Sequence, residues 1–373
     1  MAGIYLHIPY CTKRCVYCDF YFITSIKNKD MLIQAMGKEL SIRSSYLKNK
    51  TIHTIYFGGG TPSLLTKTDL SLLLNNIYKN FNVDKNAEIT LESNPENLSV
   101  TKLKELSKLG INRLSIGIQS FLNSDLKFMN RSHDSKQAIS SIVNAKKIFS
   151  NISVDLIFGL PEQNLKAWEN NYKKVFELEI QHISAYCLTV EPKTQLKKQI
   201  QNGTLVLNEE NSVKQFKSLM NNFKKYGFNQ YEISNYAQPG YESKHNNSYW
   251  NQEWYLGIGP SAHSFNGISR QWNINNNNIY IKNIQQNIGF FKKEYLSKNE
   301  IYNEYILTKL RTSKGINKKY LKTHFSSDVI NYFEKEIEKW VRKKLIYNLT
   351  NSFRLSNNGK IFTDLICQDL LLV

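Results

Sequence analysis

The chain has 373 residues, of which 41% are hydrophobic and 21% are charged, as is usual for a globular protein with a sizeable core. No apolar run approaches the roughly 18 residues of a membrane span, and the first residues lack the features of a signal peptide. We therefore expect a cytoplasmic protein in which clustered cysteines serve metal or redox chemistry. The formal charge of +18 accompanies abundant Asn and Ile, so we attribute it to composition and expect no nucleic-acid partner.

Strand-like and helix-like segments alternate along the first part of the chain. Six segments rich in β-branched and aromatic residues lie at 3–8, 51–57, 87–93, 112–119, 152–160 and 182–190. Amphipathic stretches lie between them, for example at 66–81 and 99–110. Repeated strand–helix units favour an α/β fold with a parallel sheet and right-handed crossovers. Functional residues should then gather at the carboxyl ends of the strands.

The alternation ends near residue 235, where the composition changes. A polar and aromatic segment follows, and from residue 296 the chain is charged and helical, with a short strand pair at 345–356 and a last helix. This order predicts an α-rich, winged-helix-like C-terminal region that could pack as a cap, dock a protein or bind DNA. We therefore expect three segments, with the bounds 1–235, 236–295 and 296–373.

Three of the five cysteines form a C-x3-C-x2-C pattern in the loop after the first predicted strand: Cys11, Cys15 and Cys18. Thiolates suit iron–sulfur clusters or zinc, and we expect Lys13 and Arg14 to lower the pKa values of the thiols. A structural zinc site needs a fourth ligand and usually pairs C-x2-C units. Three thiolates can instead hold three irons of a [4Fe–4S] cluster, so that the fourth iron is open to an external molecule. The spacing favours the cluster over zinc.

The cysteine motif and the aromatic residues that follow it resemble the radical S-adenosylmethionine (SAM) superfamily, in which SAM chelates the open iron. This resemblance implies a partial (β/α)6 barrel over residues 1–235, with a [4Fe–4S] cluster and SAM as cofactors. Further motifs appear in order: the glycine-rich segment 56–65, Glu92 at a strand end, and polar residues near the later strand ends. Together they resemble one family, the oxygen-independent coproporphyrinogen III oxidases and the heme chaperones related to them.

This family resemblance implies a set of residues that bind SAM. Tyr5 would contact the methionine part and Glu92 the ribose, and glycines would let backbone N–H groups approach the ligand closely. In the oxidases, several of the matching positions hold a second SAM molecule. The implied SAM-binding residues are Tyr5, Tyr17, Gly59, Gly60, Thr61, Glu92, Gln119, Arg131 and Asp155.

Two features favour the heme chaperones within this family. The oxidases have a fourth cysteine two residues after the third, where this chain has Phe20. Residues 245–250, HNNSYW, match the H-N-x-x-Y-W motif of the chaperones. The resemblance implies that His245 is an axial heme ligand, that Asn246 orients its ring, and that Tyr249 and Trp250 are flat walls. It also implies heme-acceptor proteins as partners, including membrane-associated respiratory components.

Two alternatives stay open at this point. One is an oxygen-independent coproporphyrinogen III oxidase, although Phe20 leads us not to expect that activity. The other is a radical SAM enzyme that modifies nucleic acid through its basic surface. His263 is a second heme-ligand candidate, but we expect a histidine of the core there. We also expect Cys187 and Cys367 to be buried small hydrophobic residues.

Overall fold

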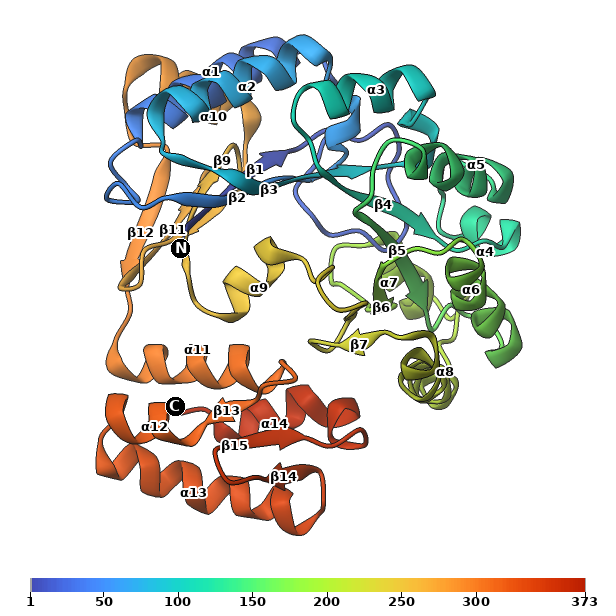
Figure 1. Cartoon of the computed structure of the whole chain (residues 1–373), viewed down its shortest axis with the longest axis vertical. Coiled ribbons are helices and arrows are strands. Elements are labelled where there is room, and N and C mark those ends of the chain that lie inside the picture. Colours follow the sequence, from blue (N-terminus) through green and yellow to red (C-terminus); the bar gives the residue numbers. More distant parts are fainter. Residues whose placement is uncertain (1, 373) are drawn as a thin grey trace.

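The computed structural model of the protein describes residues 2–372, and a twelve-stranded sheet forms its main body. Six strands of this sheet pair in parallel and in chain order, as the sequence predicted. The α/β fold with a partial barrel is thereby confirmed (Figure 1). These strands are β1 (Ala2–Ile8), β2 (Ile52–Gly59), β3 (Val83–Ser93), β4 (Arg113–Gln119), β5 (Ile152–Phe158) and β6 (His182–Cys187).

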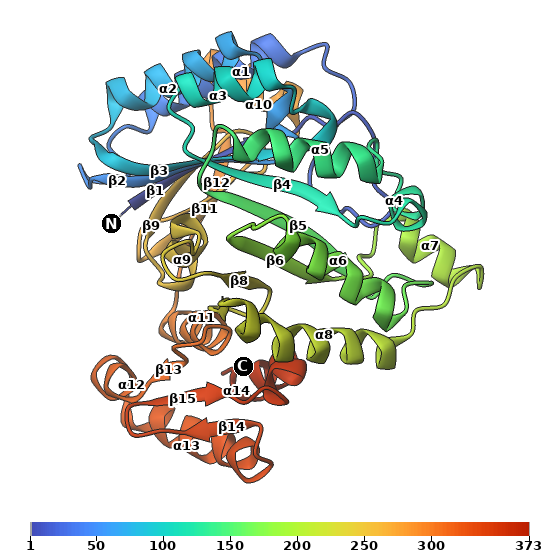
Figure 2. The same ribbon diagram turned by 45° about the vertical axis from the view of Figure 1, so that its right-hand side comes forward.

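Helices connect the parallel strands, and Figures 1 and 2 show α1, α2 and α3 together on one face of β1 to β4. The start of α2 is fixed by a capping box, in which Thr66 and Asp69 accept each other's backbone N–H groups. Ser99 caps α3 in a similar way. The helices are α1 (Lys29–Ile42), α2 (Lys67–Asn80), α3 (Val100–Lys108), α4 (Asn123–Phe128), α5 (Ser135–Lys146), α6 (Leu165–Glu177), α7 (Gln195–Gln201) and α8 (Glu209–Phe223), with short 3-10 turns η1 (Pro62–Leu64), η2 (Pro95–Asn97) and η3 (Lys224–Tyr226).

The sheet continues on both sides of the predicted boundary at residue 235. At one edge β8 pairs antiparallel with β6, and at the other edge β9 runs parallel to β1 and leads into an antiparallel group. Helix α9 (Lys244–Trp250) lies on the opposite face of β1 and β2 from α1, whereas α10 (Asn277–Gln286) packs beside α1 (Figure 2). The added strands are β7 (Asn229–Gln230), β8 (Asn235–Ala237), β9 (Trp254–Ile258), β10 (His263–Phe265), β11 (Ser269–Asn273) and β12 (Phe291–Tyr295).

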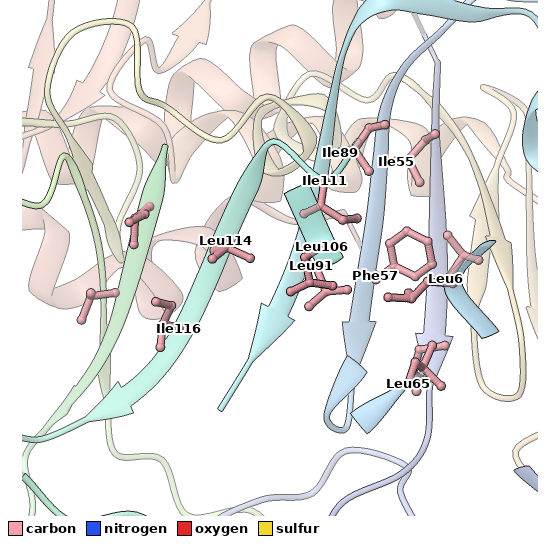
Figure 3. Packing of buried hydrophobic residues seen from close by; sticks show 14 of the residues in the cluster. Leu6, Ile55, Phe57, Leu65, Ile89, Leu91, Leu106, Ile111, Leu114 and Ile116 are labelled. Carbon is pink, nitrogen blue, oxygen red and sulfur yellow. The ribbon is translucent and has the colours of Figure 1, made fainter. Parts of the chain in front are cut away.

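Side chains of the parallel strands alternate between an apolar and a polar surrounding. In register, Leu6 lies beside Phe57 and Leu91 beside Leu114, and these side chains pack with Leu106 under the outer helices (Figure 3). Each such side chain contributes about 1.5–3 kcal/mol when it is fully buried. The intervening residues face the other side of the sheet because successive side chains alternate. They are mostly polar or aromatic, and they include Tyr5, His7, Thr54, Tyr56, Glu92, Ser115, Asp155 and Ser184.

The C-terminal region has its own apolar core and a separate three-stranded sheet of order β13-β15-β14. Helix, strand, two helices and a hairpin follow one another, which is the winged-helix-like order that the sequence predicted. None of the helices within residues 2–372 is long and apolar enough to cross a membrane. The elements are α11 (Lys298–Leu310), β13 (Ile316–Asn317), α12 (Lys318–His324), α13 (Ser327–Arg342), β14 (Ile346–Asn348), β15 (Ser352–Leu355), η4 (Gly359–Phe362) and α14 (Thr363–Leu370).

Candidate cofactor site

The cysteine loop connects β1 to α1, and backbone hydrogen bonds close its base. The N–H of Cys11 donates to the carbonyl of Ile23 at 3.1 Å, and the N–H of Ile23 donates to that of Pro9 at 2.8 Å. Cys11, Cys15 and Cys18 are all partly exposed within this closed loop. The loop therefore presents three thiols without a helix or strand of its own.

Two side chains from segments outside the loop, after β2 and after α4, reach the sulfur atoms. The hydroxyl of Thr61 donates to the Sγ of Cys11 at 3.5 Å, and the guanidinium of Arg131 donates to the Sγ of Cys15 at 3.5 Å. Such donors stabilise sulfur that carries negative charge. Thr61 follows β2 and Arg131 follows α4, so the loop is held against the carboxyl ends of two strands.

The structure does not show the lowering of the thiol pKa values that we expected from Lys13 and Arg14. Both cations are exposed, and burial raises the pKa of Cys11 and raises the pKa of Cys18 to about 11. Arg131, which is distant in the sequence, donates a hydrogen bond to Cys15 of the loop. Metal binding at this loop would therefore have to displace thiol protons.

A single metal ion would need several ligands at one point. Across residues 2–372, no three His, Cys, Asp or Glu side chains converge on one ion position. A [4Fe–4S] cluster does not require such convergence, because each thiolate binds a different iron. Three cysteines in one partly exposed loop, two of them with donors at their sulfur atoms, fit that cluster.

The glycine-rich turn after β2 packs directly against the cysteine loop. A Cβ at Gly60 would lie 2.7 Å from the carbonyl oxygen of Tyr10 and 3.0 Å from the Sγ of Cys11. Gly59 has a φ of +107°, and a Cβ there would lie 2.7 Å from the ring of His7. Only glycine permits this conformation and this approach at low cost. The turn therefore presents backbone atoms, without side chains, next to Cys11.

Glu92 lies at the end of β3, and each oxygen of its carboxylate accepts one hydrogen bond from the protein. It accepts hydrogen bonds from the Tyr56 hydroxyl at 2.8 Å and from the N–H of Gly59 at 3.1 Å. Burial raises the pKa of Glu92 to about 7 in spite of these donors. Tyr5 lies beside this pair, with its ring stacked near Tyr56 and its hydroxyl 3.1 Å from Nδ1 of His7. A partly exposed carboxyl beside a glycine turn is suited to bind hydroxyl groups of a ligand.

Arg131 connects several predicted residues beyond β4. Its guanidinium donates to the carbonyl of Gly117 at 2.8 Å and to the side chain of Asn94 at 2.7 Å. Asn94 in turn donates to Thr61 at 3.3 Å. Our sequence reasoning did not single out Asn94, although its position directly after β3 in the stretch TLESNPE was a usable signal.

The other predicted SAM residues lie around this network. Gln119 ends β4 with a backbone φ of +67°, a strained value that residues other than glycine rarely adopt. Asp155 on β5 accepts from the Ser115 hydroxyl at 3.2 Å, and burial raises its pKa. Tyr17 packs in the cysteine loop against a small apolar cluster that includes Leu126.

The HNNSYW segment forms α9, and its histidine is enclosed. His245 is 1% exposed; its Nδ1 lies 2.8 Å from the Thr54 hydroxyl and its Nε2 lies 2.9 Å from the Tyr249 hydroxyl. The ring stacks on Tyr56 at 4.9 Å between centroids. Burial lowers the pKa of His245 to about 3, so the imidazole is neutral. Thr54 and Tyr249 therefore orient the ring, the role that we expected of Asn246.

Tyr249 and Trp250 face different surroundings although they are adjacent. The ring of Tyr249 packs edge-on against Tyr255 at 4.5 Å, next to His245. Trp250 instead lines a cleft of about 650 Å³ toward the C-terminal region. The structure thus brings His245 and Tyr249 together and places Trp250 apart from them.

Three secondary expectations have clear outcomes. Cys367 is buried, as expected, but Cys187 is exposed at the end of β6, because the strand ends there at the rim of the sheet. His263 is also exposed, so the expectation of a core histidine is wrong. It lies on β10, where its ring stacks on Trp272 in the antiparallel part of the sheet.

Comparison with known proteins places this arrangement in a family. A profile of the Radical SAM superfamily matches residues 5–175, and a profile of the HemN C-terminal domain matches residues 296–362. The chain is 35% identical over 367 residues to the heme chaperone HemW of Bacillus subtilis, covering 97% of each protein. It is 36% identical to HemW of Buchnera aphidicola subsp. Schizaphis graminum, covering 96% of each.

A solved structure and a vertebrate relative agree with this placement. The structure of coproporphyrinogen III oxidase (HemN) from Escherichia coli superposes with a TM-score of 0.86 over 99% of this chain and 89% of that one, at 21% identity, which shows a common fold. The mitochondrial radical SAM domain-containing protein 1 of Danio rerio is 33% identical over 84% of this chain and 74% of its own length. The chain belongs to the HemW family of heme chaperones within the radical SAM superfamily.

Proposed function

We propose that this protein binds heme and delivers it to acceptor proteins, and that it carries a [4Fe–4S] cluster and SAM. The observation that carries the proposal is the 35% identity over 97% of the Bacillus subtilis protein named heme chaperone HemW. Phe20, which is 64% exposed, stands where the oxidases that the sequence resembles have a fourth cysteine. Decarboxylation of coproporphyrinogen III is therefore not the activity that we propose.

The three cysteines would hold the cluster, because radical SAM proteins bind it through this motif and the loop fits it. Thr61 and Arg131 would donate hydrogen bonds to the thiolates of Cys11 and Cys15. A bound cluster supplies a one-electron donor and one open iron position. The loop contributes three thiols and no fourth, so that position would be available to the amino and carboxylate groups of SAM.

The polar face of the sheet would bind the rest of SAM. Glu92 is suited to a ribose, because a carboxylate accepts from two hydroxyl groups and Tyr56 holds it in place. The bare backbone of the glycine turn lies next to Cys11, where the methionine part would lie. The full set comprises Tyr5, Tyr17, Gly59, Gly60, Thr61, Glu92, Gln119, Arg131 and Asp155. Five of these residues match the second SAM site of the oxidases: Gly60, Thr61, Gln119, Arg131 and Asp155.

Heme would bind near α9, with His245 as the iron ligand and Tyr249 and Trp250 as walls. In the closed arrangement both ring nitrogens of His245 have partners, so ligation requires the hydroxyl of Tyr249 to leave Nε2. The low pKa favours this chemistry, because a neutral imidazole is the form that binds iron. The acceptors include membrane-associated respiratory proteins, and the protein works in the cytoplasm.

The division into 1–235, 236–295 and 296–373 is part of this proposal. The first segment would carry the cluster and SAM, the second the heme motif, and the third a cap with its own core. The match of the HemN C-terminal domain to residues 296–362 supports the last boundary.

The test is anaerobic reconstitution followed by titration with heme. We expect about four irons per chain in the cluster and a saturable Soret change on heme addition. Transfer is then followed by mixing the heme-loaded protein with a heme-free cytochrome, with and without SAM. Absence of heme binding by the unaltered protein would contradict the proposal. Catalytic formation of protoporphyrinogen from coproporphyrinogen III would identify an oxidase instead.

A further inference from the structure

A cleft of about 650 Å³ separates the main sheet from the C-terminal region. One wall comes from α8, β7, β8 and α9, and the other comes from α11 and η4, and Figure 1 shows α9 and α11 facing each other. The volume lies in the range of sites for cofactors and other compact ligands. Its charged lining is unbalanced, with four lysines and one glutamate: Lys224, Lys309, Lys314, Lys360 and Glu242.

Two of these lysines are half-buried and have only uncharged partners. The Nζ of Lys309 donates to the carbonyl oxygen of Trp250 at 2.7 Å and to the side chain of Asn251 at 3.5 Å. The Nζ of Lys360 donates to the Oε1 of Gln230 at 2.6 Å and to Asn357 at 3.3 Å. None of the ion pairs within residues 2–372 includes Lys309 or Lys360.

Burial disfavours the charged form of these two ammonium groups. It lowers the pKa of Lys309 to about 8, with a further contribution from Lys314 that Glu253 partly opposes, and it lowers the pKa of Lys360 to about 8, with a contribution from Lys224. A cation held out of water without a directly paired counter-charge destabilises the fold. An anionic ligand between the two walls would supply a counter-charge in direct contact with both ammonium groups.

Trp250 lines the same cleft, beside Lys309. It belongs to the HNNSYW helix, and its own carbonyl holds Lys309 in place. The buried aromatic residues Phe223 and Tyr236 also contribute to this wall. The cleft therefore joins an aromatic surface to a pair of cations, which suits a flat apolar ligand that carries carboxylates on one edge.

We propose that this cleft binds the propionate edge of heme, with Lys309 and Lys360 as the cationic partners of the two carboxylates and Trp250 against the porphyrin. The inference rests on the proposed heme function and extends it to the C-terminal region. It also places Trp250, the proposed wall residue that lies apart from His245 and Tyr249, in this cleft.

The experiment compares two double variants with equal loss of charge. Lys309→Gln with Lys360→Gln removes the cations of the cleft, and Lys104→Gln with Lys335→Gln removes two exposed lysines on α3 and α13. Heme is titrated into each protein and followed at the Soret band, in parallel with the dimethyl ester of the same iron porphyrin. We expect the cleft variant to bind heme about tenfold more weakly or worse, because hydrogen bonds to charged groups are stronger than neutral ones. The control variant should match the unaltered protein.

The ester separates a local effect from misfolding. The unaltered protein should bind the ester as weakly as the cleft variant binds heme, and the cleft variant should not distinguish the two ligands. Equal affinity of the unaltered protein for heme and its ester would overturn the inference, and so would equal heme affinity in the cleft and control variants. Heme binding that persists in these cases leaves the chaperone function intact, whereas no binding by the unaltered protein would remove the function itself.

Discussion

The cysteine loop and helix α9 both contain side chains of the kinds that bind iron, and the fold surrounds them differently. Cys11, Cys15 and Cys18 lie partly exposed in a loop, where donors from outside the loop reach two of the sulfur atoms. The imidazole of His245 is buried, and both of its nitrogens are hydrogen-bonded to protein groups. The thiols of the loop are accessible to a ligand, whereas His245 must first lose its hydrogen bond to Tyr249.

The difference follows from where each segment lies. The loop is outside the carboxyl ends of the strands, where functional groups of such sheets gather. Helix α9 lies on the inner face of β1 and β2 and is fixed at its start by Glu88, whose carboxylate accepts from the N–H groups of Lys244 and His245 at 3.2 Å each. Its histidine therefore supports the polar face of the sheet through Thr54 and Tyr56, in addition to being the candidate heme ligand.

The largest expected effect is loss of the cluster. Replacing any one of Cys11, Cys15 or Cys18 by Ala removes one of three thiolates, and we expect the iron content to fall from about four per chain to near zero. Iron and sulfide are determined after anaerobic reconstitution, together with the visible absorbance. Cys187→Ala is the matched control, because this cysteine is exposed and distant from the loop in the sequence. A variant of the loop that kept its iron and sulfide would contradict the ligand assignment.

The next effect is on stability and concerns His245. His245→Ala deletes a buried ring, leaves the hydroxyls of Thr54 and Tyr249 without their partner, and should lower the free energy of unfolding by about 2–4 kcal/mol. Urea unfolding of the metal-free protein measures it. His263→Ala, at an exposed position, should change stability by less than about 0.5 kcal/mol.

The same variant tests the heme assignment. We expect His245→Ala to weaken heme binding and to shift the Soret band, while the reconstituted cluster keeps its absorbance. An unchanged heme affinity together with the full loss of stability would make His245 a structural residue only.

Glu92 gives a pH-dependent effect of intermediate size. Its pKa is about 7 in the folded protein and 4.5 ordinarily, so well below pH 4.5 it is protonated in both states and contributes nothing. As the pH rises toward 7 the unfolded state loses the proton first, and the stability of the folded state falls. Glu92→Gln removes this penalty. We expect its unfolding free energy, relative to the unaltered protein, to rise by about 2 kcal/mol between pH 5 and pH 8, less than the full shift gives because the carboxyl is partly exposed.

Urea unfolding of both proteins at the two pH values isolates Glu92, because all other groups are common to them. SAM binding, followed by calorimetry on the reconstituted protein, should be weakened in Glu92→Gln if the carboxylate holds the ribose. A stability difference that does not change with pH would show that the carboxyl is already ionised at pH 5.

Much of the cofactor site could be predicted from the sequence, because its parts follow successive strands of one repeated unit. The spacing of the cysteines and the glycines of β2 is local information, and parallel pairing then places Gly60 against Cys11. Contacts that join distant segments were not predictable in this way. The link from Arg131 through Asn94 to Thr61 depends on which rotamers the interior permits.

The surroundings of α9 show the same limit more strongly. A motif can suggest heme, but burial of His245 depends on Thr54, which is 191 residues away in the chain. Likewise the sequence predicted a connecting segment over 236–295 and did not reveal that β9 would pair with β1. Side-chain partners across such separations are set by the packed fold and have no periodic signature.

The smallest expected effect distinguishes the two possible roles of His245 most directly. Tyr249→Phe keeps the ring that packs on Tyr255 and removes the hydroxyl that occupies Nε2 of His245. It should cost about 1 kcal/mol of stability, the worth of one hydrogen bond. If His245 ligates heme, the same change removes a competitor and should tighten heme binding by about fivefold, since the competing bond is worth about 1 kcal/mol.

Tyr255→Phe is the matched control, because it removes a neighbouring hydroxyl that does not contact His245. Tighter binding in Tyr249→Phe but not in Tyr255→Phe would show that the closed arrangement of α9 restrains heme, so that opening of one hydrogen bond controls access. If Tyr249→Phe and His245→Ala both bind heme like the unaltered protein, the iron has another ligand. Helix α9 would then have a structural role only, and the lysine-lined cleft beside Trp250 would be the part of the protein that recognises heme.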